Sequence, residues 1–272
     1  MSQPIPSITV AVDPTNPGQF FACCGLLELA DRLWPGAEAV GCFSAPRFHR
    51  SRFTISAQVA LSSSDLIKQL VDCKRNVEEP YQPIRDSTRE PVKDVKKIKP
   101  VLFQGTKFSL RLAWWLDELT GTQTRFKTWS AHNRADELIE AAIKAIKADE
   151  ITDENLLQQR VGMTSRLGLD PRSSWNTLDT GFSPNDQSMP VDTYPATELL
   201  AAVGLETFRP SPADGGYVYA IWTHPLPVTV ARAAASGKLE IQGITRYRFE
   251  VATRGEFKYF TQASLLERRE HG

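Results

Sequence analysis

The stretch that decides the fold reads Val12-Asp-Pro-Thr-Asn-Pro-Gly-Gln-Phe-Phe-Ala-Cys-Cys-Gly-Leu-Leu-Glu-Leu-Ala-Asp-Arg-Leu-Trp34. Asn16 is a favourable N-cap residue, and Pro17 suits the first position of a helix. Gln19 stands three residues after Asn16, as in a capping box. The apolar residues that follow recur on nearly every side of the predicted helix, which is typical of a helix buried on more than one side. The core of the protein is therefore predicted to form around a helix over 17–33, directly after a strand that ends at Val12.

A weaker copy of this pattern occurs in the second half of the chain. Val191 and Asp192 correspond to Val12 and Asp13, and at the same offset residues 199–205 correspond to residues 20–26. The similarity predicts an internal duplication, in which two strand-then-helix units form related halves. A chance match between two apolar helices is the alternative.

Composition sets the broad class of the protein. The chain has 272 residues, enough for one large domain or two small ones, and it has 32 basic and 32 acidic side chains. The chain therefore has no net positive charge that would indicate a polyanionic partner. Four cysteines, at positions 23, 24, 42 and 73, lack Cys-x-x-Cys spacing and are typical of structural thiols in a reducing compartment. The sequence shows no secretory signal and no apolar run of roughly 20 residues. We therefore expect a soluble, cytoplasmic protein with no membrane partner.

The remaining pattern predicts strands and helices in irregular alternation. Helices are expected over 17–33, 64–71, 131–148, 154–159, 196–207 and 228–235. Strands are expected over 8–12, within 39–60, and over 108–115, 216–222, 241–251 and 257–260, the last two joined by a turn at 253–256. Because there is no regular βαβ order, we predict an α+β fold with mixed or antiparallel sheets and packed helices. Residues 168–194 have the composition of a loop.

The sequence predicts that the chain is organised as two halves. Residues 1–115 would form an N-terminal α+β half, with a charged arm at 78–107 that is rich in proline and lysine. Residues 116–272 would form a helical segment followed by a C-terminal α+β half. A single compact domain is the alternative.

Several catalytic motifs are missing from the sequence. It has no Gly-x-x-x-x-Gly-Lys-Ser/Thr phosphate loop, no Gly-x-Ser-x-Gly nucleophile turn and no His-Glu-x-x-His metal motif. We therefore assign no catalytic residue, no metal and no cofactor. An enzyme that cleaves or processes nucleic acid is the less favoured alternative, with His49 or His132 as its general acid or base.

Three segments suit contact with nucleic acid. Lys96, Lys97 and Lys99 in the charged arm could follow a phosphate backbone, although a solvated charged loop has the same composition. A second segment places Lys127, Trp129, His132 and Asn133 just before a predicted helix, whose N-terminal amides favour anions. The alternative for this segment places Trp129 in the core.

The third segment is a polar loop that carries Arg166, Arg172 and Trp175. Arginine and tryptophan side chains stack on unpaired bases, so this composition is consistent with a nucleic-acid contact. An ordinary surface connection is the alternative.

Five blocks of this sequence resemble a known protein family. They are Asp13-Pro-Thr-Asn-Pro-Gly-Gln-Phe-Phe-Ala-Cys-Cys-Gly-Leu-Leu-Glu-Leu-Ala30, Leu112-Ala-Trp-Trp-Leu116, Lys127-Thr-Trp-Ser130, Gly168-Leu-Asp-Pro-Arg-Ser-Ser-Trp175 and Pro195-Ala-Thr-Glu-Leu-Leu-Ala-Ala-Val-Gly-Leu205. With these blocks the chain resembles the short large-subunit-like (Csb-type) proteins of subtype I-G CRISPR systems, formerly called subtype I-U or Dpsyc.

The resemblance implies a subunit of an RNA-guided, Cascade-like interference complex in antiviral defence. Its partners would be other CRISPR effector subunits, a guide RNA and target DNA. In such complexes base pairing carries most of the sequence information, while the protein supplies backbone contacts and reads a short duplex motif. The chain is short for a full large subunit, so a reduced role is expected. The leading hypothesis is a non-catalytic subunit that contacts guide RNA or target DNA, and a purely protein-binding scaffold is the alternative.

Overall fold

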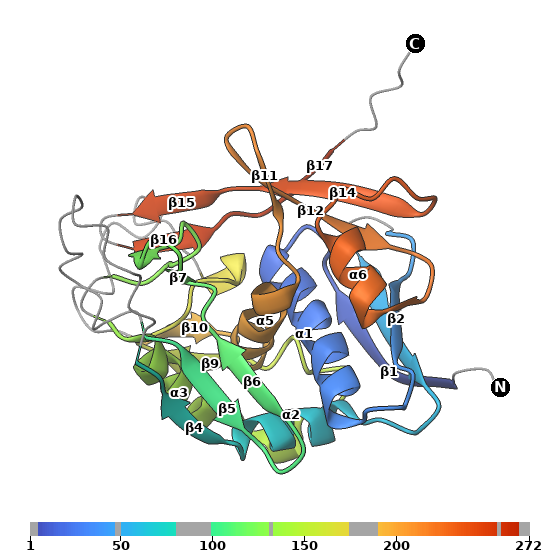
Figure 1. The fold of residues 1–272 in the computed structure, drawn as a ribbon, viewed down its shortest axis with the longest axis horizontal. Coiled ribbons are helices and arrows are strands. Elements are labelled where there is room, and N and C mark those ends of the chain that lie inside the picture. Colours follow the sequence, from blue (N-terminus) through green and yellow to red (C-terminus); the bar gives the residue numbers. More distant parts are fainter. Residues whose placement is uncertain are drawn as a thin grey trace.

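The computed structural model describes residues 5–46, 50–79, 99–130, 133–173, 190–254 and 257–266. Its helices are α1 (Pro17–Leu33), α2 (Ser63–Val71), α3 (Ala135–Ala145), α5 (Pro195–Thr207) and α6 (Val228–Ala235), with short 3₁₀ turns at Ala148–Glu150 and Pro171–Ser173. The strands form antiparallel sheets around these helices (Figure 1). The predicted α+β class is therefore confirmed.

Two four-stranded sheets are the largest in the described part of the chain. The first has the order β1 (Ile5–Val12), β3 (Ser51–Ala57), β2 (Val40–Phe43) and β13 (Leu226–Pro227). The second has the order β11 (Ser211–Ala213), β12 (Gly216–Trp222), β14 (Ile244–Phe249) and β17 (Ser264–Leu265). Because β13 joins the sheet that contains β1, strands from both ends of the chain share one sheet.

Smaller sheets complete the fold. A three-stranded sheet has the order β4 (Lys74–Val77), β5 (Val101–Gln104) and β6 (Ser109–Leu112). Three two-stranded ribbons pair β7 (Leu116–Asp117) with β8 (Thr122–Gln123), β9 (Val161–Met163) with β10 (Val191–Thr193), and β15 (Val251–Arg254) with β16 (Phe257–Phe260). Strand β16 pairs with β15 and not with β14, so the predicted partner of 257–260 is wrong except at Val251, and residues 253 and 254 of the predicted turn belong to β15.

Helix α1 begins as the sequence predicts. The Asn16 side chain accepts a hydrogen bond from the Gln19 amide at 3.1 Å, and the Gln19 side chain accepts one from the Asp13 amide at 2.8 Å. These two bonds fix the turn between β1 and α1. Every residue of α1 from Pro17 to Ala30 is buried, so the apolar pattern on all sides reflects packing on all sides.

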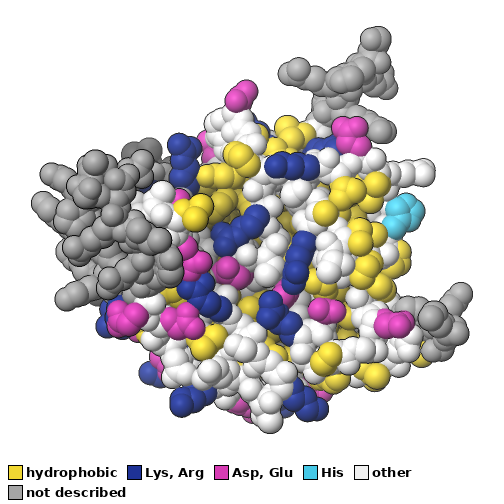
Figure 2. All heavy atoms as spheres, viewed as in Figure 1, with side chains coloured by type: hydrophobic (Ala, Val, Ile, Leu, Met, Phe, Trp, Pro, Cys, Tyr) yellow, Lys and Arg dark blue, Asp and Glu magenta, His cyan; other side chains and the backbone are white. Residues whose placement is uncertain are grey.

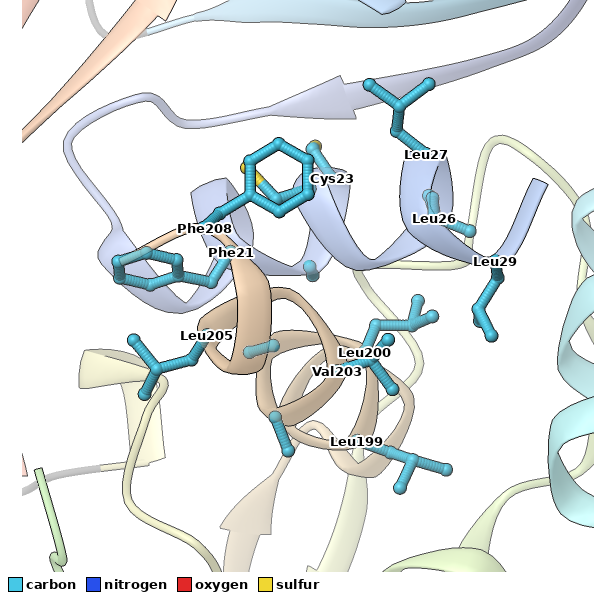
Figure 3. Close-up of a cluster of buried hydrophobic side chains, with 14 of the residues drawn as sticks. Phe21, Cys23, Leu26, Leu27, Leu29, Leu199, Leu200, Val203, Leu205 and Phe208 are labelled. Atoms are coloured by element: carbon cyan, nitrogen blue, oxygen red, sulfur yellow. The ribbon is translucent and has the colours of Figure 1, made fainter. Parts of the chain in front are cut away.

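Helices α1 and α5 cross at two glycines in the centre of the core. A Cβ atom on Gly25 would collide with the carbonyl oxygen of Leu200, and one on Gly204 would collide with the carbonyl oxygen of Phe21. Figure 3 shows the crossing, with Leu27 pointing away from α5 and Leu199 pointing away from α1. Both helices therefore bury side chains against other elements as well as against each other.

The residues that meet at the crossing are the ones that correspond to each other in the predicted internal repeat. Gly204 corresponds to Gly25 and Leu200 to Phe21, so the two backbone contacts are reciprocal. The surrounding strands do not follow this symmetry, because β1 pairs with β3, which follows α1, whereas β10 pairs with β9, which precedes α5. The repeat therefore describes the helix pair and not the sheets. Buried residues from both predicted halves belong to one core cluster.

Three other local predictions are wrong. Residues 101–104 form strand β5 within the expected charged arm, because the buried Val101 and Phe103 alternate with the half-buried Leu102 and the exposed Gln104. Residues 154–159 contain turns instead of a helix, and the expected helix over 131–148 is reduced to α3. Across the described segments, none of the helices has the length and apolar character needed to cross a membrane.

Candidate nucleic-acid interface

Two of the predicted contact residues lie in the core. Trp129 is 4% exposed and packs edge-on against Trp114 and Trp115, with ring centres 5.7 and 5.5 Å away. Lys127 is also buried, and its amine donates hydrogen bonds to the carbonyl oxygens of Trp129 and Ser130 at 2.7 and 3.3 Å. A base needs an exposed ring face and a phosphate needs an exposed cation, so the prediction that Trp129 and Lys127 contact nucleic acid is wrong.

The loop with Arg172 is attached to the starts of α1 and α5. Arg172 donates to both carboxylate oxygens of Asp170, which is fully buried and also accepts from the Asn16 side chain at 2.8 Å. The guanidinium carbon of Arg172 lies 3.5 Å from the centre of the Tyr194 ring. Its bonds are thus directed into the protein, and its main role is to hold residues 167–173 in place.

The other predicted residues that the structure describes do not form one group. Lys99 pairs with Glu79 on the surface, and Asn133 and Arg166 are half-buried. Lys96, Lys97, His132 and Trp175 lie outside the described residues, as does His49. The structure therefore does not bring the three predicted segments together into a described surface.

Glu198 lies beneath the Arg172 loop and has an unusual pKa. Its buried carboxylate accepts hydrogen bonds from the amides of Leu169 and Asp170 at 3.1 and 3.0 Å. Burial, together with the neighbouring Asp170 charge, raises the pKa of Glu198 to about 7, while the two amides and Arg166 act in the opposite direction. Burial has the largest effect because the site excludes the water that would stabilise the charge.

This pKa predicts a pH-dependent stability. Because the folded state binds the proton more tightly than the unfolded chain, the free energy of unfolding should fall as pH rises from about 5 to about 8, by up to roughly 3 kcal/mol. Denaturant unfolding across this range measures the effect. Glu198→Gln keeps an acceptor for the two amides and should remove most of the slope. An equal slope in this variant and in the wild type would contradict the assignment.

A different group of cations surrounds Glu28 in α1. Arg32 donates through Nε to Oε1 of Glu28 at 2.6 Å. Arg232 of α6 donates through Nη2 to the same oxygen at 2.7 Å and to Oε2 at 2.6 Å, and Thr207 of α5 donates to Oε2 at 3.0 Å. The two guanidinium groups are therefore held side by side by one carboxylate.

The charges in this group lie at different depths. The Glu28 side chain is completely buried, whereas those of Arg32 and Arg232 are each 33% exposed. Burial alone would raise the pKa of Glu28, but the hydrogen bonds and charges of Arg232 and Arg32 outweigh it and lower the pKa below its ordinary value. The surface above Glu28 thus presents two positive groups, while their negative partner is hidden beneath them.

Arg209 follows the end of α5, two residues after Thr207, which bonds to Glu28. It bonds to Glu206 and to the carbonyl oxygen of Trp114, and its side chain is 42% exposed against 19% for Glu206. Glu206 also accepts from the amides of Ala113 and Trp114, so its position is fixed from both sides. We call Arg32, Arg209 and Arg232 the arginine group. Figure 2 shows several dark blue side chains, with some magenta ones among them, in the middle of the face where β6, α1, α5 and α6 meet.

Arg111 of β6 is not part of the arginine group, because its acidic partners are as exposed as it is. It bonds to Glu78 and Glu118, and these carboxylates, 35% and 44% exposed, reach the surface as far as Arg111 does at 36%. Its charge is therefore neutralised at the surface. Sequence reasoning missed the arginine group, although one signal was present: Glu28 is an acidic residue inside an apolar helix, four residues before Arg32.

Among the described residues, no three or more histidine, cysteine, aspartate or glutamate side chains gather where they could hold a metal ion. Comparison with protein-family models, with curated proteins and with solved structures finds no match for this chain.

Proposed function

We propose that this protein is a non-catalytic subunit of a type I CRISPR interference complex, and that it contacts guide RNA or target DNA through the arginine group. The observation that carries the contact is the pair Arg32 and Arg232, whose exposed guanidinium groups are held side by side by the buried carboxylate of Glu28. Planar guanidinium groups in fixed positions bind phosphate with little loss of side-chain freedom. The resemblance described above supports the type of complex.

The resembling blocks and the arginine group support different parts of this proposal. Most of the described residues in these blocks are buried: α1, α5, the Trp114–Trp115 pair and Trp129 all belong to the core. The resemblance is thus carried mainly by residues that shape the fold. Contact with nucleic acid rests on the surface arginines alone, and it is tested separately.

Charge removal at two arginines tests the contact. Arg32→Gln leaves Glu28 bonded to Arg232 and Thr207, and Arg209→Gln leaves Glu206 bonded to two amides, so both variants should fold. We expect each to weaken binding of fluorescent single-stranded RNA and DNA, and to reduce the slope of log affinity against log salt by roughly 0.7. Fluorescence anisotropy at several salt concentrations measures both quantities.

Arg160→Gln is the matched control, since Arg160 is 63% exposed and pairs with the equally exposed Asp192. It should change neither the affinity nor the salt slope. If the variant with both Arg32→Gln and Arg209→Gln binds as the wild type does, the arginine group is not the interface. Crosslinking in the assembled complex separates the alternatives further, because crosslinks to protein subunits alone would favour a scaffold.

A further inference from the structure

Strand β4 forms one edge of its sheet and has a strand partner on one side alone in the described part of the chain. The sheet order is β4–β5–β6, so β5 covers one side of β4. Figure 1 shows α3 next to β4 at this end of the sheet. An edge strand with unpaired amide and carbonyl groups can accept a further strand.

The register shows which backbone groups face this open edge. The amide of Glu78 donates to the carbonyl oxygen of Pro100, its direct partner, at 3.0 Å. In an antiparallel ladder alternate residues bond to the same neighbour, so Asn76 also bonds to β5. The backbone groups of Arg75 and Val77 therefore point outward, away from β5.

A hollow of about 460 Å³ lies beside these outward groups. It is lined by residues 75–77 of β4, by Val101 of β5, and on α3 by Asp136, Glu137, Ile139, Glu140, Ala141 and Lys144. Val77 lies opposite Val101 in the ladder and is 39% exposed, whereas Val101 and Ile139 are already buried. The hollow thus contains the partly exposed apolar side chain of Val77, next to backbone groups that can form hydrogen bonds with another strand.

The charges along α3 differ between its two ends. In its first turn Asp136 and Glu137 share the single cation Arg134, at 2.6 and 3.7 Å. Further along, Glu140 is shared by two cations, Arg75 at 3.0 Å and Lys144 at 3.5 Å. The hollow therefore has a negative excess near the start of α3 and a positive excess near its end. The helix rises roughly 12 Å between Asp136 and Lys144, about the length of four residues in an extended strand.

We propose that an extended segment of another protein subunit adds to β4 as a fourth strand in this hollow. The segment would bond to the backbone of Arg75 and Val77 and cover the Val77 side chain. Charge complementarity places a basic side chain of the segment near Asp136 and Glu137, and an acidic one near Lys144. This inference does not rest on contact with nucleic acid, so either proposal can fail alone.

Two short peptides provide the probe. They are the acetylated and amidated sequences Lys-Val-Thr-Val-Glu and Glu-Val-Thr-Val-Lys, which cover both directions of the added strand. With one of them, at millimolar concentration, we expect hydrogen exchange at the amides of Arg75 and Val77 to slow about tenfold. The same peptide with alternate amides N-methylated should have no effect, because it lacks the donors that the strand needs.

A proline substitution provides the matched variants. Val77→Pro removes an outward donor that the sheet does not use, and proline is tolerated at such edge positions. Peptide binding should be lost in Val77→Pro and retained in Val77→Ala, with thermal unfolding confirming that both variants are folded.

Three results would overturn the proposal. The first is unchanged exchange at Arg75 and Val77 with both peptides. The second is slow exchange at these amides in the dilute protein alone, which would mean that the chain itself covers the edge. The third is slowing that grows with protein concentration without peptide, which would identify a second copy of the chain as the occupant.

Discussion

Replacing Gly204 with alanine is expected to lower the free energy of unfolding by about 3 kcal/mol or more. Alanine ordinarily stabilises a helix relative to glycine, by roughly 1 kcal/mol. Here the added Cβ would collide with the carbonyl oxygen of Phe21, and neither backbone can move without separating α1 from α5. The sign of the change is therefore diagnostic of the crossing. Denaturant unfolding measures it, and Gly25→Ala should behave in the same way.

Gly162→Ala is the control for this prediction. The nearest atom to a Cβ at this position is Cβ of Pro190 at 3.5 Å, an ordinary contact distance. We expect its free energy of unfolding to change by less than about 0.5 kcal/mol. A Gly204→Ala protein as stable as the wild type would show that the backbones of the two helices are not in contact at Gly204.

Replacing Arg232 with methionine is expected to destabilise the protein by about 3 kcal/mol. The change keeps most of the aliphatic stem but leaves the buried carboxylate of Glu28 with Arg32 as its one remaining cation. Glu28→Gln should cost less, about 1 kcal/mol, because the two arginines that lose their partner are one-third exposed and remain hydrated. Chemical unfolding of both variants tests this asymmetry.

The double variant and the pH dependence complete this test. Glu28→Gln added to Arg232→Met should recover most of the lost stability, because it removes the uncompensated charge. In the wild type the lowered pKa of Glu28 means that its contribution is present above the ordinary pKa of a carboxyl group and is lost as pH falls. In Arg232→Met this trend should reverse, since a buried carboxylate with fewer partners gains stability on protonation. Additive losses in the double variant would contradict the coupling.

The predictions that held came from signals within single segments. The cap at Asn16, the position of Pro17 and the apolar pattern that follows predicted α1 with its observed bounds. The helix over 196–207 and the strand over 216–222 also match α5 and β12 to within a residue. By contrast, β5 was missed because its four residues adjoin a long charged run, and a strand so short takes its stability from the neighbours that pair with it.

The residues of the candidate site could not be predicted from single segments of the sequence. Lys127 and Trp129 were chosen because their residue types suit phosphate and bases, but residue type does not report exposure, and both are buried. Arg209 and Arg232 stand in segments with no basic motif. Arg232 is held beside Arg32 by Glu28, and Arg209 bonds to the carbonyl oxygen of Trp114; each of these partners lies far away in the chain.

The sequence by itself determined that this protein is an α+β protein built on two helices that are apolar on all sides, because caps and periodicity act within a few turns of the chain. The tertiary structure decided which charges reach the surface. Glu28 is buried only because α1, α5 and α6 meet around it, and this meeting brings Arg32 and Arg232 together at the surface. Exposure follows from the packing of distant segments, and no local pattern records that packing.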